Sequence, residues 1–142
     1  RMLCQISRVV LAATLLTVSM ALPAGPQMAI VTSLHDSAGN FFCLDLYGQN
    51  TAEGAKIDLW TCTGVLGQKW YFDSGSYNIA SAADPSKCVE IGNMSTGASL
   101  SLRTCKTGSF EQRFGWDENG ALYLIESHLP ELCIVPEVNK TA

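Results

Sequence analysis

The stretch CLDLYGQNTAEGAKIDLWTCTGVLGQKW, residues 43–70, combines two aspartates, two tryptophans and two glutamines with a pair of cysteines. Two carboxylates are the groups with which glycosidases hydrolyse a sugar linkage, but that reaction needs the acids held opposite each other across a cleft. Asp45 and Asp58, within one short and shallow segment, do not provide that arrangement. We therefore expect no catalytic residue here.

Strand alternation divides the side chains of IDLW into two sets. Ile57 and Leu59 point to one side, which we expect to be the core, and Asp58 and Trp60 point to the other. A tryptophan exposed beside acids indicates a binding surface. The alternative is that Trp60 packs in the core, as we expect of Trp70.

Other patterns that carry chemistry are weak. The sequence LHDS, residues 34–37, places His, Asp and Ser side by side, but a catalytic triad depends on spatial geometry, so we expect a loop. His35 and His128 lack the spacing of a metal site, and the sequence has no glycine-rich phosphate loop. We expect no metal and no cofactor.

The first residues have the layout of a secretory signal peptide. Two arginines precede an uncharged apolar run at residues 9–22, which is shorter than the roughly 20 residues that a membrane-spanning helix needs. Small residues suit cleavage after Ala21, or as a second choice after Ala24. We expect residues 1–21 to be removed and the protein to be secreted; an uncleaved anchor or a buried helix is the alternative. Arg1 before Met2 suggests a fragment.

The remaining chain is acidic. Without the two arginines of the leader, seven of the nine basic residues remain against thirteen acidic ones. Nucleic-acid binding depends on neutralising phosphates with a basic face, which this chain lacks. We therefore expect no nucleic-acid partner and no insertion into a membrane after signal removal.

The elements that hold these residues recur along the chain. Cys43, Cys88 and Cys133 are each 45 residues apart, and IDLWTC and GQKWYF in the first unit correspond to LSLRTC and EQRFGW in the second. Such a fixed period indicates a repeat architecture. We expect three units, at about residues 32–74, 75–119 and 120–142.

Each unit is predicted to consist of four short strands, because its segments alternate apolar and polar residues between glycine-containing turns. Three such units predict an all-β domain closed into a small barrel. The spacing predicts disulfides Cys43–Cys62 and Cys88–Cys105. By the same spacing the partner of Cys133 would lie beyond Ala142, so we expect a third unit that is truncated.

Cys-Leu-Asp, a glycine turn, Leu-Trp-x-Cys and Gln-x-Trp together resemble the repeat of the ricin B-chain type (R-type) lectins. The resemblance covers about residues 29–142, and it implies a β-trefoil fold of three pseudo-repeats. It is strongest in the first unit, which carries every landmark: Cys43, Asp45, Gly48, Gly54, Leu59, Trp60, Cys62, Gln68 and Trp70.

The resemblance implies a shallow sugar site in the first unit. Asp45 would accept hydrogen bonds from two hydroxyls of a galactose-like ring, and Trp60 would stack under the apolar face of the sugar. Asp58 and Gln68 would hold or assist the acid. Gly67 departs from the pattern, because galactose binders often have an amide side chain there.

The other units are weaker matches. Glu90 takes the acid position of the second unit, Arg103 replaces the stacking aromatic and Phe114 replaces the core tryptophan. We expect Arg103 to pair with Glu90, leaving a site that is silent or prefers a different, acidic glycan. Val135 stands at the acid position of the third unit, where no site is expected.

These observations predict a secreted, non-enzymatic carbohydrate-binding module whose partners are glycans. One alternative is the targeting module of a truncated secreted glycoside hydrolase or toxin. The other is a β-trefoil interaction or inhibitor protein that binds no sugar.

Overall fold

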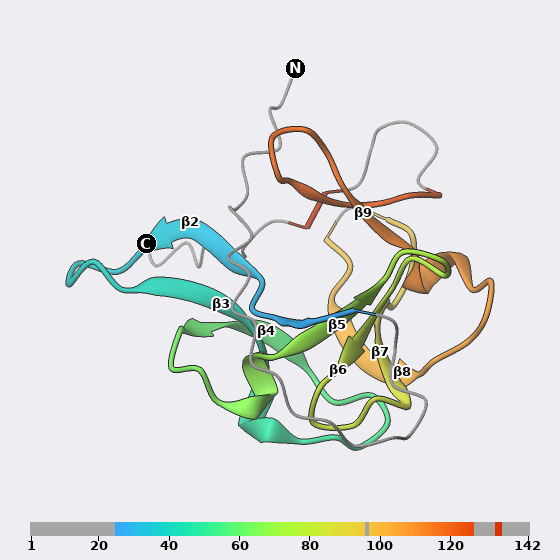
Figure 1. Ribbon diagram of the computed structural model, residues 1–142, viewed down its shortest axis with the longest axis horizontal. Helices are drawn as coiled ribbons and strands as arrows, with labels where there is room; N and C mark the ends of the chain where they lie inside the picture. The colour runs from blue at the N-terminus through green and yellow to red at the C-terminus, as the bar shows by residue number, and fades with distance from the viewer. Residues whose placement is uncertain (1–24, 96, 127–132, 135–142) are drawn as a thin grey trace.

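The computed structural model describes residues 25–95, 97–126 and 133–134 (Figure 1). The predicted signal peptide, the end of the third unit and Val135 lie outside the described residues.

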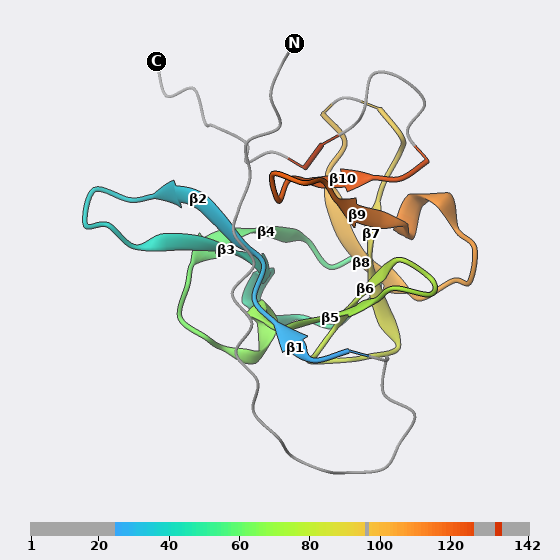
Figure 2. The same ribbon diagram turned by 45° about the horizontal axis from the view of Figure 1, so that its top comes forward.

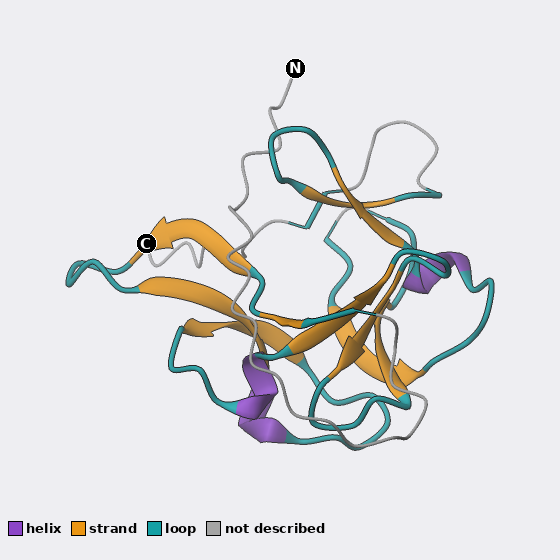
Figure 3. Cartoon of the chain, in the orientation of Figure 1, coloured by secondary structure: helices purple, strands orange, loops and turns teal. Residues whose placement is uncertain are grey.

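The described chain is built of short strands and single-turn 3-10 helices, as Figure 3 shows. The elements are β1 (Gln27–Met28), β2 (Val31–His35), β3 (Phe41–Leu46), η1 (Tyr47–Gln49), β4 (Ile57–Thr61), η2 (Leu66–Gln68), β5 (Trp70–Asp73), β6 (Asn78–Ser81), β7 (Lys87–Ile91), β8 (Leu100–Thr104), η3 (Phe110–Gln112), β9 (Phe114–Trp116) and β10 (Leu122–Leu124). The prediction of an all-β chain is confirmed.

The strands form three antiparallel sheets. One sheet has the order β1-β5-β6-β7-β8, a second pairs β10 with β9, and a third has the order β2-β3-β4. Four strands, β2 to β5, come from the first predicted unit, and four, β6 to β9, come from the second. Figure 2 shows the hairpin of β2 and β3 extending away from the other strands. This arrangement agrees with the β-trefoil fold that the resemblance implied.

The two complete units have the same register. In the first unit β3 pairs with β4 so that Cys43 lies opposite Trp60. In the second unit β7 pairs with β8 so that Cys88 lies opposite Arg103. Trp60 and Arg103, which correspond in the sequence repeat, therefore occupy equivalent places in the fold.

The core is formed by inward-facing residues of the first two units together with Leu122 and Leu124 of β10. Trp70 and Phe114, the aromatic residues of the Gln-x-aromatic landmarks, are fully buried. The indole Nε1 of Trp70 donates a hydrogen bond to the carbonyl oxygen of Leu44 at 3.0 Å, so the burial of this polar group is compensated. Trp70 is a core residue, as expected.

Disulfides join the middle strands of both units. Cys43 is bonded to Cys62 and Cys88 to Cys105, which confirms both predicted pairs. Cys133 is disulfide-bonded as well. The place of its partner, which we expect beyond Ala142, lies outside the described residues.

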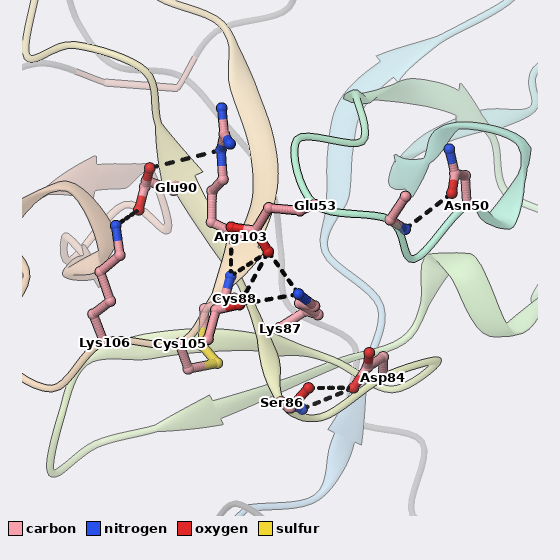
Figure 4. A network of polar contacts seen from close by, with 12 residues as sticks. Asn50, Glu53, Asp84, Ser86, Lys87, Cys88, Glu90, Arg103, Cys105 and Lys106 are labelled. Atoms are coloured by element: carbon pink, nitrogen blue, oxygen red, sulfur yellow. Dashed lines mark hydrogen bonds and ion pairs between the residues drawn. A yellow bond between two sulfur atoms is a disulfide. The ribbon is translucent and has the colours of Figure 1, made fainter.

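The loop between η1 and β4 docks on the edge of β8 in the second unit. The backbone N–H of Gly54 donates to the carbonyl of Leu102 at 2.8 Å, and the N–H of Leu102 donates to that of Ala55 at 2.8 Å. The Glu53 carboxylate accepts hydrogen bonds from Lys87 Nζ at 2.6 Å and from Thr104 (Figure 4). These contacts fix the first unit against the second.

Candidate functional site

Trp60 lies on the outer face of β4. Its side chain is 60% exposed, whereas Ile57 on the same strand is buried in the core. Strand alternation gives this result, because Asp58 and Trp60 share one face and Ile57 and Leu59 share the other. The prediction that Trp60 is exposed is confirmed.

Asp45 lies beside this indole on the neighbouring strand. It is directly opposite Asp58 in the β3–β4 ladder, and only 9% of it is exposed. Burial raises the pKa of the Asp45 carboxyl, the nearby Gln68 side chain opposes that effect, and the charge of Asp58 raises the pKa further. A carboxylate with few protein partners and a raised pKa is poised to accept hydrogen bonds from a bound molecule.

Asp58 lies opposite Asp45 in the ladder, and its charge contributes to the raised pKa of that acid. Its Oδ2 pairs with Lys56 Nζ at 3.3 Å. Its Oδ1 is buried without a hydrogen-bond partner among the described residues. An unpaired buried acceptor is rare in a folded protein and marks this carboxylate as an unusual group.

Gln68 is buried and supports the site through the backbone. Its Oε1 accepts hydrogen bonds from the N–H groups of Thr63 and Gly64, at 2.8 and 3.1 Å, and its Nε2 donates to the carbonyl of Thr61 at 2.9 Å. Gln68 therefore closes the loop between β4 and η2 and orders the end of the strand that carries Trp60. This role was not evident from the sequence.

Gln49 is a residue that the sequence analysis missed. A side chain at Gly67 would project towards it, since a Cβ there would lie 3.1 Å from Gln49 Cγ. Gln49 is exposed and has a φ of 54°, in the left-handed region that residues other than glycine seldom occupy. Gly67 could have indicated this residue from the sequence. A site that lacks the usual amide side chain at one position can obtain an amide from a neighbouring one.

Tyr47 and Lys56 flank the same face. The Tyr47 ring is exposed, and Lys56 Nζ lies 5.7 Å from its centroid while it also pairs with Asp58. The ammonium thus ties the η1 turn to β4. The face formed by Asp45, Gln49, Asp58 and Trp60 is called the first-unit face below.

The corresponding place in the second unit has a different chemistry. Glu90 lies where Asp45 lies in the first unit, and it pairs with Lys106 at 3.3 Å and with Arg103 at 3.9 Å (Figure 4). Gln112 Nε2 donates to Glu90 Oε2 at 2.9 Å. The predicted pairing of Arg103 with Glu90 is confirmed.

A mostly apolar pocket of about 460 Å³ lies beside the first disulfide, and neither Asp45 nor Trp60 contributes to it. We assign the candidate site to the first-unit face because that face carries the exposed indole and the unpaired carboxylate oxygen. The pocket is lined by Ala29, Val31, Gly39, Asn40, Phe41, Cys43, Cys62, Gly64 and Gln68.

The structure explains the LHDS segment as a turn. Asp36 Oδ1 accepts hydrogen bonds from the N–H groups of Ala38 and Asn40, both at 2.9 Å. Within residues 25–95, 97–126 and 133–134, no group of three His, Cys, Asp or Glu side chains is placed to hold a metal ion. Over the same residues, no helix has the length and apolar character needed to cross a bilayer.

The family model of the ricin-type β-trefoil lectin domain matches residues 31–141. The chain belongs to this lectin domain family. Membership supports carbohydrate binding in general and agrees with the repeat landmarks on which the resemblance was based. No curated protein is found to match the sequence.

Solved structures share the fold of this lectin domain. The β-trefoil lectin of the Vibrio vulnificus hemolysin/cytolysin, solved with N-acetyl-D-lactosamine bound, is 20% identical with a TM-score of 0.62, over 78% of this chain and 77% of that one. The designed threefold symmetric protein ThreeFoil is 23% identical with a TM-score of 0.50, over 61% and 66%. A mosquitocidal holotoxin is 18% identical with a TM-score of 0.50, over 74% of this chain and 13% of the toxin.

Proposed function

We propose that this lectin domain binds a galactose-like sugar through the first-unit face. The observation that carries the proposal is the exposed indole of Trp60 next to a carboxylate pair whose hydrogen-bonding capacity the protein leaves partly unused. A pyranose has one face of C–H groups and an edge of hydroxyls. An aromatic plate beside charged acceptors matches both.

Each residue of the face has a distinct task in this proposal. Trp60 stacks under the apolar face of the ring, and Asp45 accepts hydrogen bonds from two neighbouring hydroxyls. Asp58 Oδ1, buried and without a partner among the described residues, accepts a hydrogen bond from a sugar hydroxyl or a bridging water once the carboxylate turns towards the ligand. Gln68 holds the loop that follows β4, and so positions these groups without donating to the sugar.

Gln49 replaces the amide that Gly67 lacks. Its side chain occupies the direction in which a residue at position 67 would project. Among the described residues its amide has no hydrogen-bond partner, which leaves it available to a ligand. Position 67 must then be a glycine, because a side chain there would displace Gln49.

We further propose that the domain is secreted and acts without catalysis. The disulfides Cys43–Cys62 and Cys88–Cys105 suit an oxidising compartment. The first-unit face contains no nucleophile next to a base, and its two acids stand side by side on adjacent strands, which suits binding better than hydrolysis.

Titration of the protein with methyl β-galactoside and with N-acetyl-D-lactosamine, followed by calorimetry, tests the proposal. We expect Trp60→Ala to weaken binding by at least about tenfold, equivalent to about 1.4 kcal/mol. We expect Gln49→Ala to weaken it by a smaller factor. Phe110→Ala, which removes an exposed aromatic of η3 outside this face, is the matched control and leaves the affinity unchanged.

Circular dichroism separates loss of binding from loss of folding. Equal affinity of Trp60→Ala and the unaltered protein, with both folded, would show that the indole is not part of a sugar site. Unfolding of Trp60→Ala would contradict the assignment as well, since an exposed side chain should be dispensable for folding.

A further inference from the structure

The second unit presents a cationic version of the first-unit face. Arg103 lies opposite Cys88 in the β7–β8 ladder, as Trp60 lies opposite Cys43 in the β3–β4 ladder. A guanidinium therefore stands where the first unit places its indole. The scaffold around it, a disulfide-bonded strand pair followed by a 3-10 turn, is the same.

The second face is less acidic than the first, because it carries more basic residues. Glu90 is one carboxylate between two cations, Arg103 and Lys106. Gln112 donates to the same Glu90 oxygen as Lys106 and holds that oxygen in place. Glu111 lies within electrostatic reach of Lys106 as well, so two acids balance two cations on this face, whereas the first-unit face has two carboxylates and a single lysine.

The ion pair with Glu90 leaves the N–H donors of the Arg103 guanidinium available. The approach is made by Nε alone, at 3.9 Å, which is too long for a hydrogen bond. Nε itself is buried without a hydrogen-bond partner within the described part of the chain. Neither Nη1 nor Nη2 of Arg103 forms a hydrogen bond to another described residue. By contrast, Nη1 of Arg113 is occupied by Glu126.

Arg103 and Lys106 are also accessible. Their side chains are 42% and 59% exposed, while Glu90 beneath them is only 14% exposed. The guanidinium lies against Gly54 of the neighbouring loop, where an added Cβ would be 3.5 Å from Cζ and from Nη1. The loop that Glu53 ties to the second unit thus supports the guanidinium from one side and leaves the other side open.

We propose that the second-unit face, formed by Glu90, Arg103 and Lys106, binds the carboxylate of an acidic sugar. The planar guanidinium presents two N–H groups that match a carboxylate, and Lys106 adds a second donor. The other charged groups of the chain are mostly acidic, which disfavours polyanions such as nucleic acid but tolerates a single negative charge on a saccharide. This inference rests on the proposed function only in taking the ligand to be a saccharide.

The test follows the side-chain Nε–H resonance of Arg103 in a ¹⁵N-labelled protein during titration with methyl β-glucuronoside. We expect a saturable shift that methyl β-galactoside does not produce. We expect Arg103→Gln to weaken binding of the glucuronoside, measured by calorimetry, by at least about tenfold, because it removes two charge-assisted hydrogen bonds. Lys69→Gln, with the same loss of charge at a residue away from this face, leaves the affinity unchanged.

Two further arms make the result decisive. Trp60→Ala should retain the response of Arg103 even if it abolishes galactoside binding, so failure of the first-unit site and failure of this one are distinguishable. Arg103→Lys should recover little affinity, because the ammonium lacks the planar pair of donors.

Absence of a saturable shift at Arg103 would overturn the proposal. Equal affinity of Arg103→Gln and Lys69→Gln for the glucuronoside would also overturn it. Sodium acetate serves as a second probe. If acetate saturates the shift at the same concentration as the glucuronoside, the site binds anions in general, and the proposal of an acidic sugar as ligand is wrong.

Discussion

The pairing of Asp45 with Asp58 places two carboxylates directly opposite each other on neighbouring strands. Like charges in this position destabilise a sheet, and burial adds to the cost at Asp45 by raising its pKa. A hydrophobic or amide residue would be more favourable for the fold. An arrangement that costs stability at one exposed face is typical of a binding site.

Replacing Asp45 by Asn should therefore separate stability from binding. Asp45→Asn removes the like-charge pair, and we expect the free energy of unfolding at pH 7 to rise by roughly 0.2–1 kcal/mol. Galactoside affinity should fall by about tenfold or more, because a charged acceptor is lost. Urea denaturation and calorimetry measure the two effects. Glu118→Gln, which removes the charge of an exposed acid, is the control.

The same carboxyl gives the binding a pH dependence. The pKa of Asp45 is higher in the folded protein than in the unfolded chain, which means that ionising this carboxyl disfavours folding. The protonated carboxyl therefore stabilises the fold at a pH below its unfolded pKa. This stabilisation is lost as the pH rises through the folded pKa. Sugar binding, which needs the ionised acceptor, should change in the opposite direction and weaken as pH falls through that raised pKa. Asp45→Asn should abolish the pH dependence of binding and remove only the Asp45 contribution to that of stability, because the contribution of Glu53 remains. Galactoside affinity that still falls with pH in this variant would show that another group causes the effect.

At the scale of elements, the docking of the η1–β4 loop on β8 depends on Glu53. Hydrogen bonding to Lys87, followed by that to Thr104, lowers the pKa of the Glu53 carboxyl from 4.5 to about 2. A group with a depressed folded pKa contributes stability above its unfolded pKa, and this contribution is lost as pH falls through the folded pKa. The contact between the units should therefore weaken between about pH 4.5 and pH 2.

Glu53→Gln tests this contact. We expect the melting temperature to fall at pH 7, and the difference from the unaltered protein to vanish as the pH approaches 2, where the native carboxylate is protonated too. Differential scanning calorimetry over this range measures the effect, with Glu118→Gln again as the control for charge. A difference that stays constant with pH would show that the ionised form of Glu53 is not what stabilises the contact.

The strands, the repeat and two disulfides could be predicted from the sequence because they rest on short periods: alternation along IDLW and the recurrence of cysteines. The exposure of Trp60 followed from the same alternation. The docking of Glu53 could not be predicted, since it joins residues 51 positions apart. Gln49 was missed for a related reason, because its proximity to Gly67 arises only when η1 and η2 pack together.

For the whole molecule, the repeated units share one core but have diverged on their outer faces. The residue two positions after the landmark glutamine, Gln68 or Gln112, is aromatic in both units. These residues, Trp70 and Phe114, are both fully buried. The outer position opposite the first cysteine of each unit is an indole in one and a guanidinium in the other. Packing constrains the inner position, whereas the outer one is free to set which ligand is recognised.

One substitution made at two tryptophans tests this division between core and face. Trp70→Phe removes the donor to the Leu44 carbonyl and leaves a buried acceptor short of a partner, so we expect a loss of about 1–3 kcal/mol in the free energy of unfolding. Trp60→Phe, at an exposed position, should change it by less than about 0.5 kcal/mol. Urea denaturation with the disulfides intact measures both. Galactoside affinity should respond in the opposite order, because the smaller ring at position 60 contacts less of the sugar while the folded Trp70→Phe protein keeps its binding face. Equal losses of stability at the two positions would mean that Trp60 supports the core, and the first-unit face would then have no indole to offer a ligand.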